Sequence, residues 1–329
     1  MTPTLSPRAR LGAVVLAAVV LAALAVTYTV RATDRPEPTA GTHHVTLDNT
    51  HGLYVRSERG TIAALGKKSP QQTGLSCRRF YASGNGAVCL TTKPGIPPRS
   101  QAIVLDRSLH PRRSVTFGGT PNRARVSPSG RMVSWTVFVS GDSYAGNSFS
   151  TRSGILDTRT GYLIKNVETL RLTLDGKRYG ASDLNFWGIT FADDDNRFYA
   201  TASTHGKTYL VEGDLKNWTA RTLRTNVECP SLSPDGTRIA FKKRVREGTS
   251  DPWQLHVLDL KTMRETPLAE ARSVDDQAAW LDDRTVSYAL PGQGRNSTDV
   301  WSVPADGSGA PKLLARDASS PSMNAPESR

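Results

Sequence analysis

The chain has 329 residues and carries 42 lysine and arginine residues against 30 aspartate and glutamate residues, for a formal net charge of +12. This excess favours an anionic neighbour, but no recognised nucleic-acid-binding motif accompanies it, so we predict no nucleic-acid partner. The first of only three cysteines is Cys77, which excludes a lipid-modified cysteine anchor near the N-terminus.

The N-terminal segment predicts export. Residues 1–10 carry Arg8 and Arg10 and form a basic cytoplasmic segment, while residues 11–30 are an uncharged run of about the length that crosses a bilayer as a helix. We favour an uncleaved signal anchor, because the run exceeds the usual apolar core of a secretory signal. The alternative is cleavage near Ala23–Ala25 and secretion. Both outcomes place the rest of the chain outside the cytoplasm, either as a single-pass cell-membrane protein or as a secreted one.

A short linker and one folded domain follow. Residues 31–42 contain Pro36 and Pro38 and predict an extended linker. The strand patterns then occupy residues 43–323, which leaves residues 324–329 as a disordered tail.

Two hairpin signals stand out in this domain. Ser127, Pro128, Ser129 and Gly130 lie between two short apolar runs, and Ser233, Pro234, Asp235 and Gly236 do the same. Turn-forming residues between short β-branched runs predict tight antiparallel hairpins. In these turns the proline presets the backbone and the glycine accepts a positive φ, so we predict a structural role for both motifs.

The hairpins belong to a weak internal repeat. Its marker, the first apolar position after each turn, recurs at intervals of 45, 65, 41 and 47 residues, at Val88, Val133, Phe198, Ile239 and Val286. Four-stranded propeller blades occupy roughly 40 to 50 residues. We therefore predict one blade per marker and an insertion in the long interval.

The two ends of the domain predict how the ring closes. Residues 53–55 and 61–65 form an outer strand pair with no inner pair before it, whereas residues 317–323 begin like a further blade. A blade shared by the two termini leaves no unpaired sheet edge at the seam. The predicted fold is therefore all-β, a six-bladed β-propeller with terminal strands sharing one blade.

A family resemblance rests on the clearest hairpin. Residues 233–241, which read SPDGTRIAF, resemble the repeat signature of TolB-type propellers, a WD-like repeat. The resemblance implies a TolB-like six-bladed propeller. The TolB family also has an α/β domain before its propeller, and we expect this chain to lack it, since only twelve residues separate residue 30 from residue 43.

The cysteines leave two alternatives open. A hairpin centred on residues 83–86 places Cys89 opposite Phe80, with Cys77 three residues further along the partner strand. A Cys77–Cys89 disulfide would then need a bulge or another register. The alternative is two buried free thiols, and we expect Cys229 to be an unpaired, buried third thiol.

No pattern predicts catalysis. Residues 141–146 have one residue too many for the Gly-x-Ser-x-Gly elbow of a hydrolase, and the six histidines lack the spacing of metal ligands. The acidic groups at residues 193–195, 275–276 and 282–283 are expected to be turn residues rather than calcium ligands. We predict no catalytic, metal or cofactor-binding residue and a protein that is not an enzyme.

The favoured function is a non-catalytic, extracytoplasmic binding or scaffold propeller, monomeric, whose partner is a protein or an anionic envelope component. We expect contact at the loops of one channel mouth, with the insertion at residues 139–152 as the first candidate. Basic clusters at residues 242–246, 112–113 and 123–125 are either anion-binding surfaces or solvated strand ends. The alternatives are an exported enzyme resembling a lactonase or a glycan lyase, and a glycan or peptide sensor.

Overall fold

The computed structural model describes Arg8, Ala13 and residues 16–23, 45–48, 52–66, 69–96, 98–139, 150–246, 248–294 and 297–324. The described residues of the N-terminal segment are helical, and none of the helices in the described part of the chain is long and apolar enough to span a membrane. Most of the predicted segment 11–30, the linker 31–42 and the last five residues lie outside the described residues.

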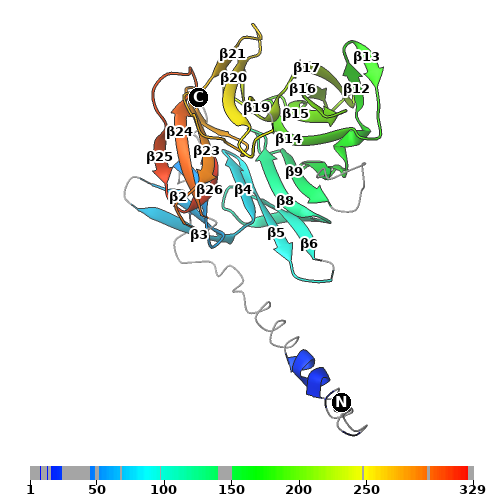
Figure 1. Ribbon diagram of the computed structural model, residues 1–329, viewed down its shortest axis with the longest axis vertical. Helices are drawn as coiled ribbons and strands as arrows, with labels where there is room; N and C mark the ends of the chain where they lie inside the picture. The colour runs from blue at the N-terminus through cyan, green and yellow to red at the C-terminus, as the bar shows by residue number, and fades with distance from the viewer. Residues whose placement is uncertain are drawn as a thin grey trace, which may run out of the picture. The chain divides into compact units, whose positions relative to one another are not determined.

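The described part of the domain forms six antiparallel blades arranged in a ring (Figure 1). Blade 1 contains β4 (Arg79–Ser83), β5 (Gly86–Lys93), β6 (Arg99–Leu105) and β7 (Pro111–Phe117). Blade 2 contains β8 (Thr120–Val126), β9 (Met132–Val139), β10 (Ser150–Asp157) and β11 (Leu163–Ile164). Blade 3 contains β14 (Asn185–Phe191), β15 (Arg197–Thr204), β16 (Lys207–Asp214) and β17 (Thr219–Thr225), extended by β12 (Arg171–Leu174) and β13 (Lys177–Tyr179).

The ring continues through three further blades. Blade 4 contains β18 (Glu228–Leu232), β19 (Arg238–Arg244), β20 (Trp253–Asp259) and β21 (Glu265–Pro267). Blade 5 contains β22 (Ala279–Asp282), β23 (Thr285–Pro291), β24 (Thr298–Pro304) and β25 (Lys312–Ala315). Blade 6 contains β26 (Ala318–Asn324), β1 (Gly52–Ser57), β2 (Thr61–Leu65) and β3 (Pro70–Ser76).

The first strand of each blade lines the central channel, and each such strand contacts the next around the ring. The core lies between neighbouring blades, where apolar residues of the middle strands meet. Val88 and Leu90 of β5, for example, pack in one buried cluster with Val133 and Trp135 of β9. All five repeat markers fall on the second strand of a blade, so the predicted six-bladed propeller is confirmed.

The seam also closes as predicted. The C-terminal strand β26 is the innermost strand of blade 6 and pairs antiparallel with β1, where Leu53 lies opposite Met323. Residues 53–55 and 61–65, however, form the second and third strands of the blade rather than an outer pair. The outermost strand, β3, went unpredicted because its sequence, PQQTGLS, is polar and mostly exposed. β26 extends to Asn324, one residue beyond the predicted end of the propeller, and Asn324 is buried.

The long repeat interval contains additional structure in blade 3. A 3-10 turn at Val167–Thr169 leads into the β12–β13 hairpin, and β12 pairs in parallel with β17, which widens this sheet to six strands. Part of the predicted loop 139–152 belongs to strands, since Val139 ends β9 and Ser150–Arg152 begin β10. Residues 140–149 lie outside the described residues.

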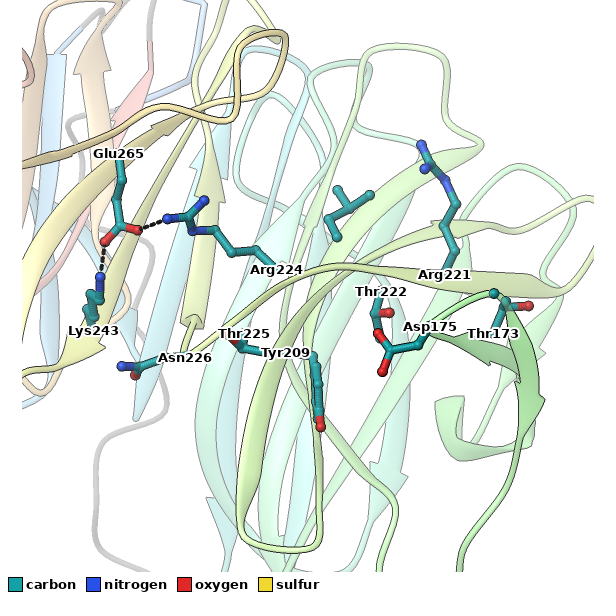
Figure 2. A pocket seen from close by; sticks show the side chains of 12 residues that line it. Thr173, Asp175, Tyr209, Arg221, Thr222, Arg224, Thr225, Asn226, Lys243 and Glu265 are labelled. Carbon is teal, nitrogen blue, oxygen red and sulfur yellow. Dashed lines mark hydrogen bonds and ion pairs between the residues drawn. The ribbon is translucent and has the colours of Figure 1, made fainter.

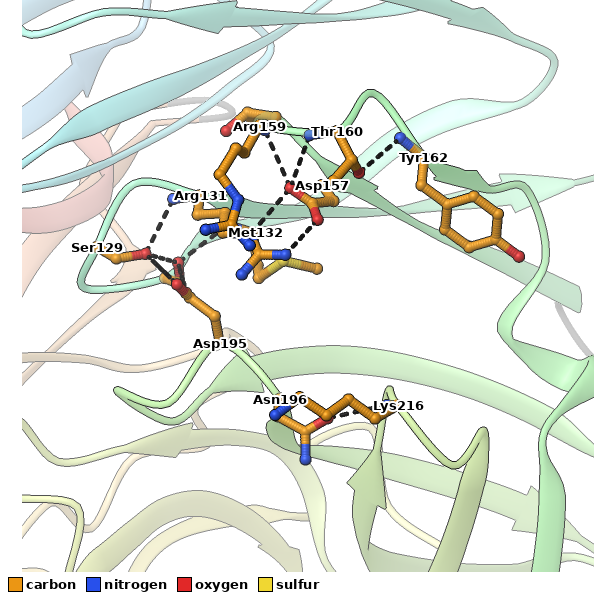
Figure 3. A network of polar contacts seen from close by, with 12 residues as sticks. Ser129, Arg131, Met132, Asp157, Arg159, Thr160, Tyr162, Asp195, Asn196 and Lys216 are labelled. Atoms are coloured by element: carbon orange, nitrogen blue, oxygen red, sulfur yellow. Dashed lines mark hydrogen bonds and ion pairs between the residues drawn. The ribbon is translucent and has the colours of Figure 1, made fainter.

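The two repeat motifs form turns that reach the neighbouring blade. In the turn after β8, the Ser127 Oγ donates to Asp195 Oδ1 at 2.7 Å, and the Ser129 Oγ donates to the same oxygen at 2.6 Å. Figure 3 shows the contact of Ser129 with Asp195 beside the ion pair of Arg131 with Asp157. Gly130 has φ +77°, and the turn closes through its N–H to the Ser127 carbonyl.

The second turn repeats the arrangement between blades 4 and 5. Asp235 Oδ1 accepts hydrogen bonds from the Ser233 Oγ at 2.5 Å and from the Thr237 N–H at 3.0 Å. The Asp235 N–H donates to Asp283 Oδ1 at 2.9 Å in the next blade. Gly236 has φ +70°. We call the end of the channel that carries these inner hairpin turns the turn face.

A disulfide joins Cys77 and Cys89, with their Cα atoms 5.4 Å apart. The register places Phe80 opposite Cys89, and no bulge interrupts the β4–β5 ladder. The expectation that a bridge needs a bulge or another register was therefore wrong. Cys77 lies before β4 rather than on its extension, and its N–H donates to the Gly60 carbonyl of the β1–β2 turn. Cys229 is a free, buried thiol.

Candidate binding site at the channel mouth

A cavity of about 770 Å³ lies at the end of the channel opposite the turn face. Arg79 and Thr120, which begin the inner strands β4 and β8, line it, whereas the turns at residues 83–86 and 127–130 end those strands. The inner strands therefore run from this mouth cavity to the turn face. Its size suits a small ligand or a short peptide segment.

The charged residues of the mouth cavity divide by blade. Arg56, Arg78 and Arg79 come from blades 6 and 1, with Glu58 among them, and so leave two positive charges in excess on this side. Three aspartates, Asp251, Asp275 and Asp276, come from the loops of blades 4 and 5. The cavity thus has a basic side and an acidic side.

Arg79 is only weakly compensated by its neighbours. Its side chain is 29% exposed, and its one ion pair in the described part of the chain is with Asp276 at 3.7 Å, beyond hydrogen-bond length. Asp276 also faces Arg123 at 3.9 Å and accepts from the Ala289 N–H. Burial, followed by repulsion from Arg123, lowers the pKa of Arg79 to about 10.

Two buried arginines of β8 lie beneath the cavity. Arg123 donates to the Asp275 carbonyl at 3.5 Å, and Arg125 donates to the Ala278 carbonyl at 2.5 Å and lies 4.3 Å above the Tyr81 ring. The Nε of each guanidinium has no hydrogen-bond partner among the described residues. Arg123 also donates to the Asn122 side chain and faces Asp276 at 3.9 Å, and Arg125 also donates to the Ser231 Oγ at 3.5 Å, so carbonyl oxygens and polar side chains together hold these buried cations.

Lys242 is buried next to the acidic side of the mouth cavity and pairs with one of its carboxylates. Its ammonium group pairs with Asp275 and lies 3.6 Å from Glu228 Oε2, and it sits 4.1 Å from the centre of the Trp253 ring. Burial raises the pKa of Glu228. Asp275 remains 69% exposed above this pair, which leaves part of its carboxylate facing the cavity.

A second cavity, the side groove, holds about 760 Å³ between β17 of blade 3 and blade 4. Figure 2 shows Glu265 at one end of the groove, where it accepts from Arg224 at 2.7 Å and from Lys243 at 2.5 Å. His256 Nδ1 lies 2.9 Å from the same carboxylate, and burial lowers the pKa of this histidine. The Glu265 carboxylate is fully engaged by protein partners, in contrast to Arg79 in the mouth cavity.

The residues of the predicted basic clusters fall into two groups, one paired or stacked with neighbouring side chains and the other buried in the channel. Lys243 pairs with Glu265, Arg244 stacks on Trp253, and Arg112 pairs with Asp106 at 2.7 Å. Arg123 and Arg125 are buried in the channel instead of on a surface. Arg112, 72% exposed near the start of β7, and Arg244, exposed at the end of β19, are nevertheless solvated strand ends, as one of the two expectations had it.

The aspartates that were predicted to be turn residues also fall into two groups, one bonded to the backbone of turns and the other in ion pairs at the mouth cavity. Asp194 accepts from the Arg197 N–H and Asp282 accepts from the Arg284 N–H, as expected of turn residues. Asp275 and Asp276 lie at the mouth cavity in ion pairs, so their assignment to turns was wrong. In the described part of the chain, no cluster of three or more His, Cys, Asp or Glu side chains is placed to hold a metal ion.

Sequence reasoning missed Arg79 and Asp251 as site residues. Arg79 is the first residue of β4. Once a propeller is predicted, the first residue of an inner strand is expected to lie at a channel mouth. Asp251 lies in the loop between β19 and β20, which carried no comparable signal.

No protein-family model matches the chain, and no curated protein sequence matches it. Its fold is nevertheless similar to solved structures. TolB from Acinetobacter baumannii is 18% identical with a TM-score of 0.58, and the match covers 83% of this chain and 66% of that one. A protein described as TolB from Agrobacterium tumefaciens is 13% identical with a TM-score of 0.50, over 84% of this chain and 93% of that one.

The chain spans just under two thirds of the length of the Acinetobacter protein. An oligogalacturonate lyase in complex with manganese is also matched, at 10% identity and a TM-score of 0.46 over 75% of this chain and 66% of that one, too distant to bear on chemistry. At these identities the similarity concerns architecture alone. The chain is a six-bladed β-propeller with a TolB-like fold.

Proposed function

We propose that this propeller is a non-catalytic binding module outside the cytoplasm and that its mouth cavity takes a segment of a partner protein. The observation that carries the proposal is Arg79, a partly exposed guanidinium at a cavity of about 770 Å³, with a single long ion pair in the described part of the chain. Under-compensated charge in a concave site favours a ligand that completes it.

The proposed location rests on the sequence. The basic residues before residues 11–30 favour an anchor at the cell membrane with the propeller outside, and signal cleavage with secretion is the alternative. A protein partner is preferred to a bulk anionic polymer, because most of the basic clusters are already paired or buried.

Catalysis is the competing function and has its own test. An exported lyase or lactonase would need convergent carboxylates or a bound metal ion, and the carboxylates Asp275 and Asp276 are instead paired with Lys242 and Arg79. Metal analysis of the purified protein distinguishes the two functions. A stoichiometric ion would favour the enzyme.

Photo-cross-linking in cells tests the binding proposal. A photoreactive amino acid replaces Ser250 or Pro291 at the mouth cavity, or Pro234 or Lys216 at the turn face, in the full chain. We expect a discrete cross-linked protein from the mouth positions and none from the turn face. Equal capture from both ends, or no discrete product from the mouth, would refute the proposal.

A further inference from the structure

We propose that the mouth cavity recognises a peptide segment that presents a carboxylate next to an ammonium group. This inference rests on the proposed binding function and names the chemistry of its ligand. A cavity of uniform charge would select a ligand of the opposite sign, whereas the mouth cavity carries both signs of charge on its two sides.

The basic side provides a carboxylate subsite at Arg79 and Arg78. Arg79 makes no side-chain hydrogen bond to the described residues, and its contact with Asp276 is 3.7 Å long. Arg78 is exposed, and its side chain has no ion pair or hydrogen bond within the described part of the chain. Two guanidinium groups with free N–H donors match the planar, bidentate geometry of a carboxylate.

The acidic side provides an ammonium subsite at Asp251 and Asp275. Asp251 is exposed and has no ion pair among the residues described, while Asp275 keeps 69% of its side chain exposed despite its pair with Lys242. An ammonium group is a compact charge with three donors and can bridge carboxylates without fixed orientation.

The two subsites together disfavour singly charged ligands. A segment with only a carboxylate would face the three aspartates of the acidic side, and one with only an ammonium group would face the guanidinium groups of the basic side. Like charges across a confined site weaken binding. A lysine beside an aspartate satisfies both sides at once.

Four synthetic peptides test the inference on the purified full chain. They share the frame acetyl-Gly-Ser-x-y-Ser-Gly-amide, in which x is Lys or Gln and y is Asp or Asn, and calorimetry or NMR titration measures their dissociation constants. We expect the Lys-Asp peptide to bind about fivefold more tightly than either singly charged peptide. Equal affinity for all four, or no binding at about 10 mM, would overturn the inference.

Matched variants assign the subsites. Arg79→Gln is expected to abolish the preference for Asp over Asn and to keep the preference for Lys over Gln, and Asp251→Asn should do the reverse. Arg284→Gln and Asp193→Asn make the same chemical changes at exposed turn-face positions and should alter neither preference. If both mouth variants lose both preferences, the two-subsite assignment is wrong.

The outcome is separable from that of the binding proposal. Cross-linking from Ser250 or Pro291 that persists while the peptides show no charge preference would reject the ligand chemistry alone. Loss of all cross-linking would reject the binding function itself.

Discussion

The turn face and the mouth cavity lie at opposite ends of the same inner strands, yet their polar groups are arranged differently. At the turn face, Asp235 and Asp195 accept several short hydrogen bonds from their own or the neighbouring blade. At the mouth, Arg79 has one ion pair of 3.7 Å in the described part of the chain, and it shares the carboxylate of that pair, Asp276, with the buried Arg123 at 3.9 Å. The difference indicates that the turns stabilise the ring and that the mouth retains binding capacity.

Substituting the turn glycines tests whether the turns stabilise the ring, and it should have the largest effect on the free energy of unfolding. Gly130→Ala is expected to destabilise the fold by about 3 kcal/mol, because the residue has φ +77° and an added Cβ would lie 2.8 Å from the Asn85 carbonyl oxygen. Gly236→Ala is the matched control. It has φ +70° but no atom within 4 Å of the added Cβ, so about 1 kcal/mol is expected from strain alone.

Chemical denaturation of both variants measures the difference. Equal destabilisation by the two substitutions would show that the contact between the turns of blades 1 and 2 contributes nothing to the ring.

Removing a turn carboxylate should have the next largest effect. Asp235→Ala is expected to lower the free energy of unfolding by about 1 to 2 kcal/mol, since the Thr237 N–H and the Arg238 guanidinium lose an acceptor. Peptide binding at the mouth should stay unchanged. A loss of binding without a loss of stability would reverse the roles assigned to the two ends.

The same carboxylate predicts a pH dependence. The pKa of Asp235 is about 2 in the folded chain, where hydrogen bonds from Ser233, Thr237 and Arg238 outweigh its partial burial, against about 3.9 when unfolded. A depressed acid contributes stability above its unfolded pKa and loses it as the pH falls towards the folded pKa. Between pH 4 and pH 2, stability should therefore fall less steeply in Asp235→Asn than in the wild type, as measured by denaturation at each pH.

Neutralising the mouth arginine should have the smallest effect on stability. Arg79→Gln is expected to change the free energy of unfolding by less than about 0.5 kcal/mol or to raise it, because burial already disfavours the charged form, whose pKa is lowered to about 10. Denaturation beside wild type measures this change. A loss above about 2 kcal/mol would place Arg79 among the structural residues.

Sequence reasoning reached the fold because blade periodicity depends on local signals. The turn motifs at residues 127–130 and 233–236 and the markers on the second strands are local, and the termini follow from closing a ring. β3 and the β12–β13 hairpin were missed, since a polar outer strand and a parallel addition to β17 carry little hydrophobic pattern.

The candidate site was less accessible to sequence reasoning. Arg79, Asp251 and Asp276 are about 25 to 200 positions apart in sequence, and only ring closure brings them to one cavity. Asp275 and Asp276 resembled turn residues because their sequence context does not reveal Lys242 and Arg79 as partners. The Cys77–Cys89 bridge depended on a bend before β4 that strand register alone does not predict.

The most direct test of the division between the two ends combines cross-linking with one substitution at each end. A photoreactive residue at position 250 is placed in chains that also carry Arg79→Gln or Arg284→Gln, and the yield of the captured partner is compared with that of the parent chain. We predict that Arg79→Gln lowers the yield of capture about fivefold while Arg284→Gln leaves it intact, with both chains equally stable. Undiminished capture in Arg79→Gln would contradict the claim that the mouth cavity is the binding site.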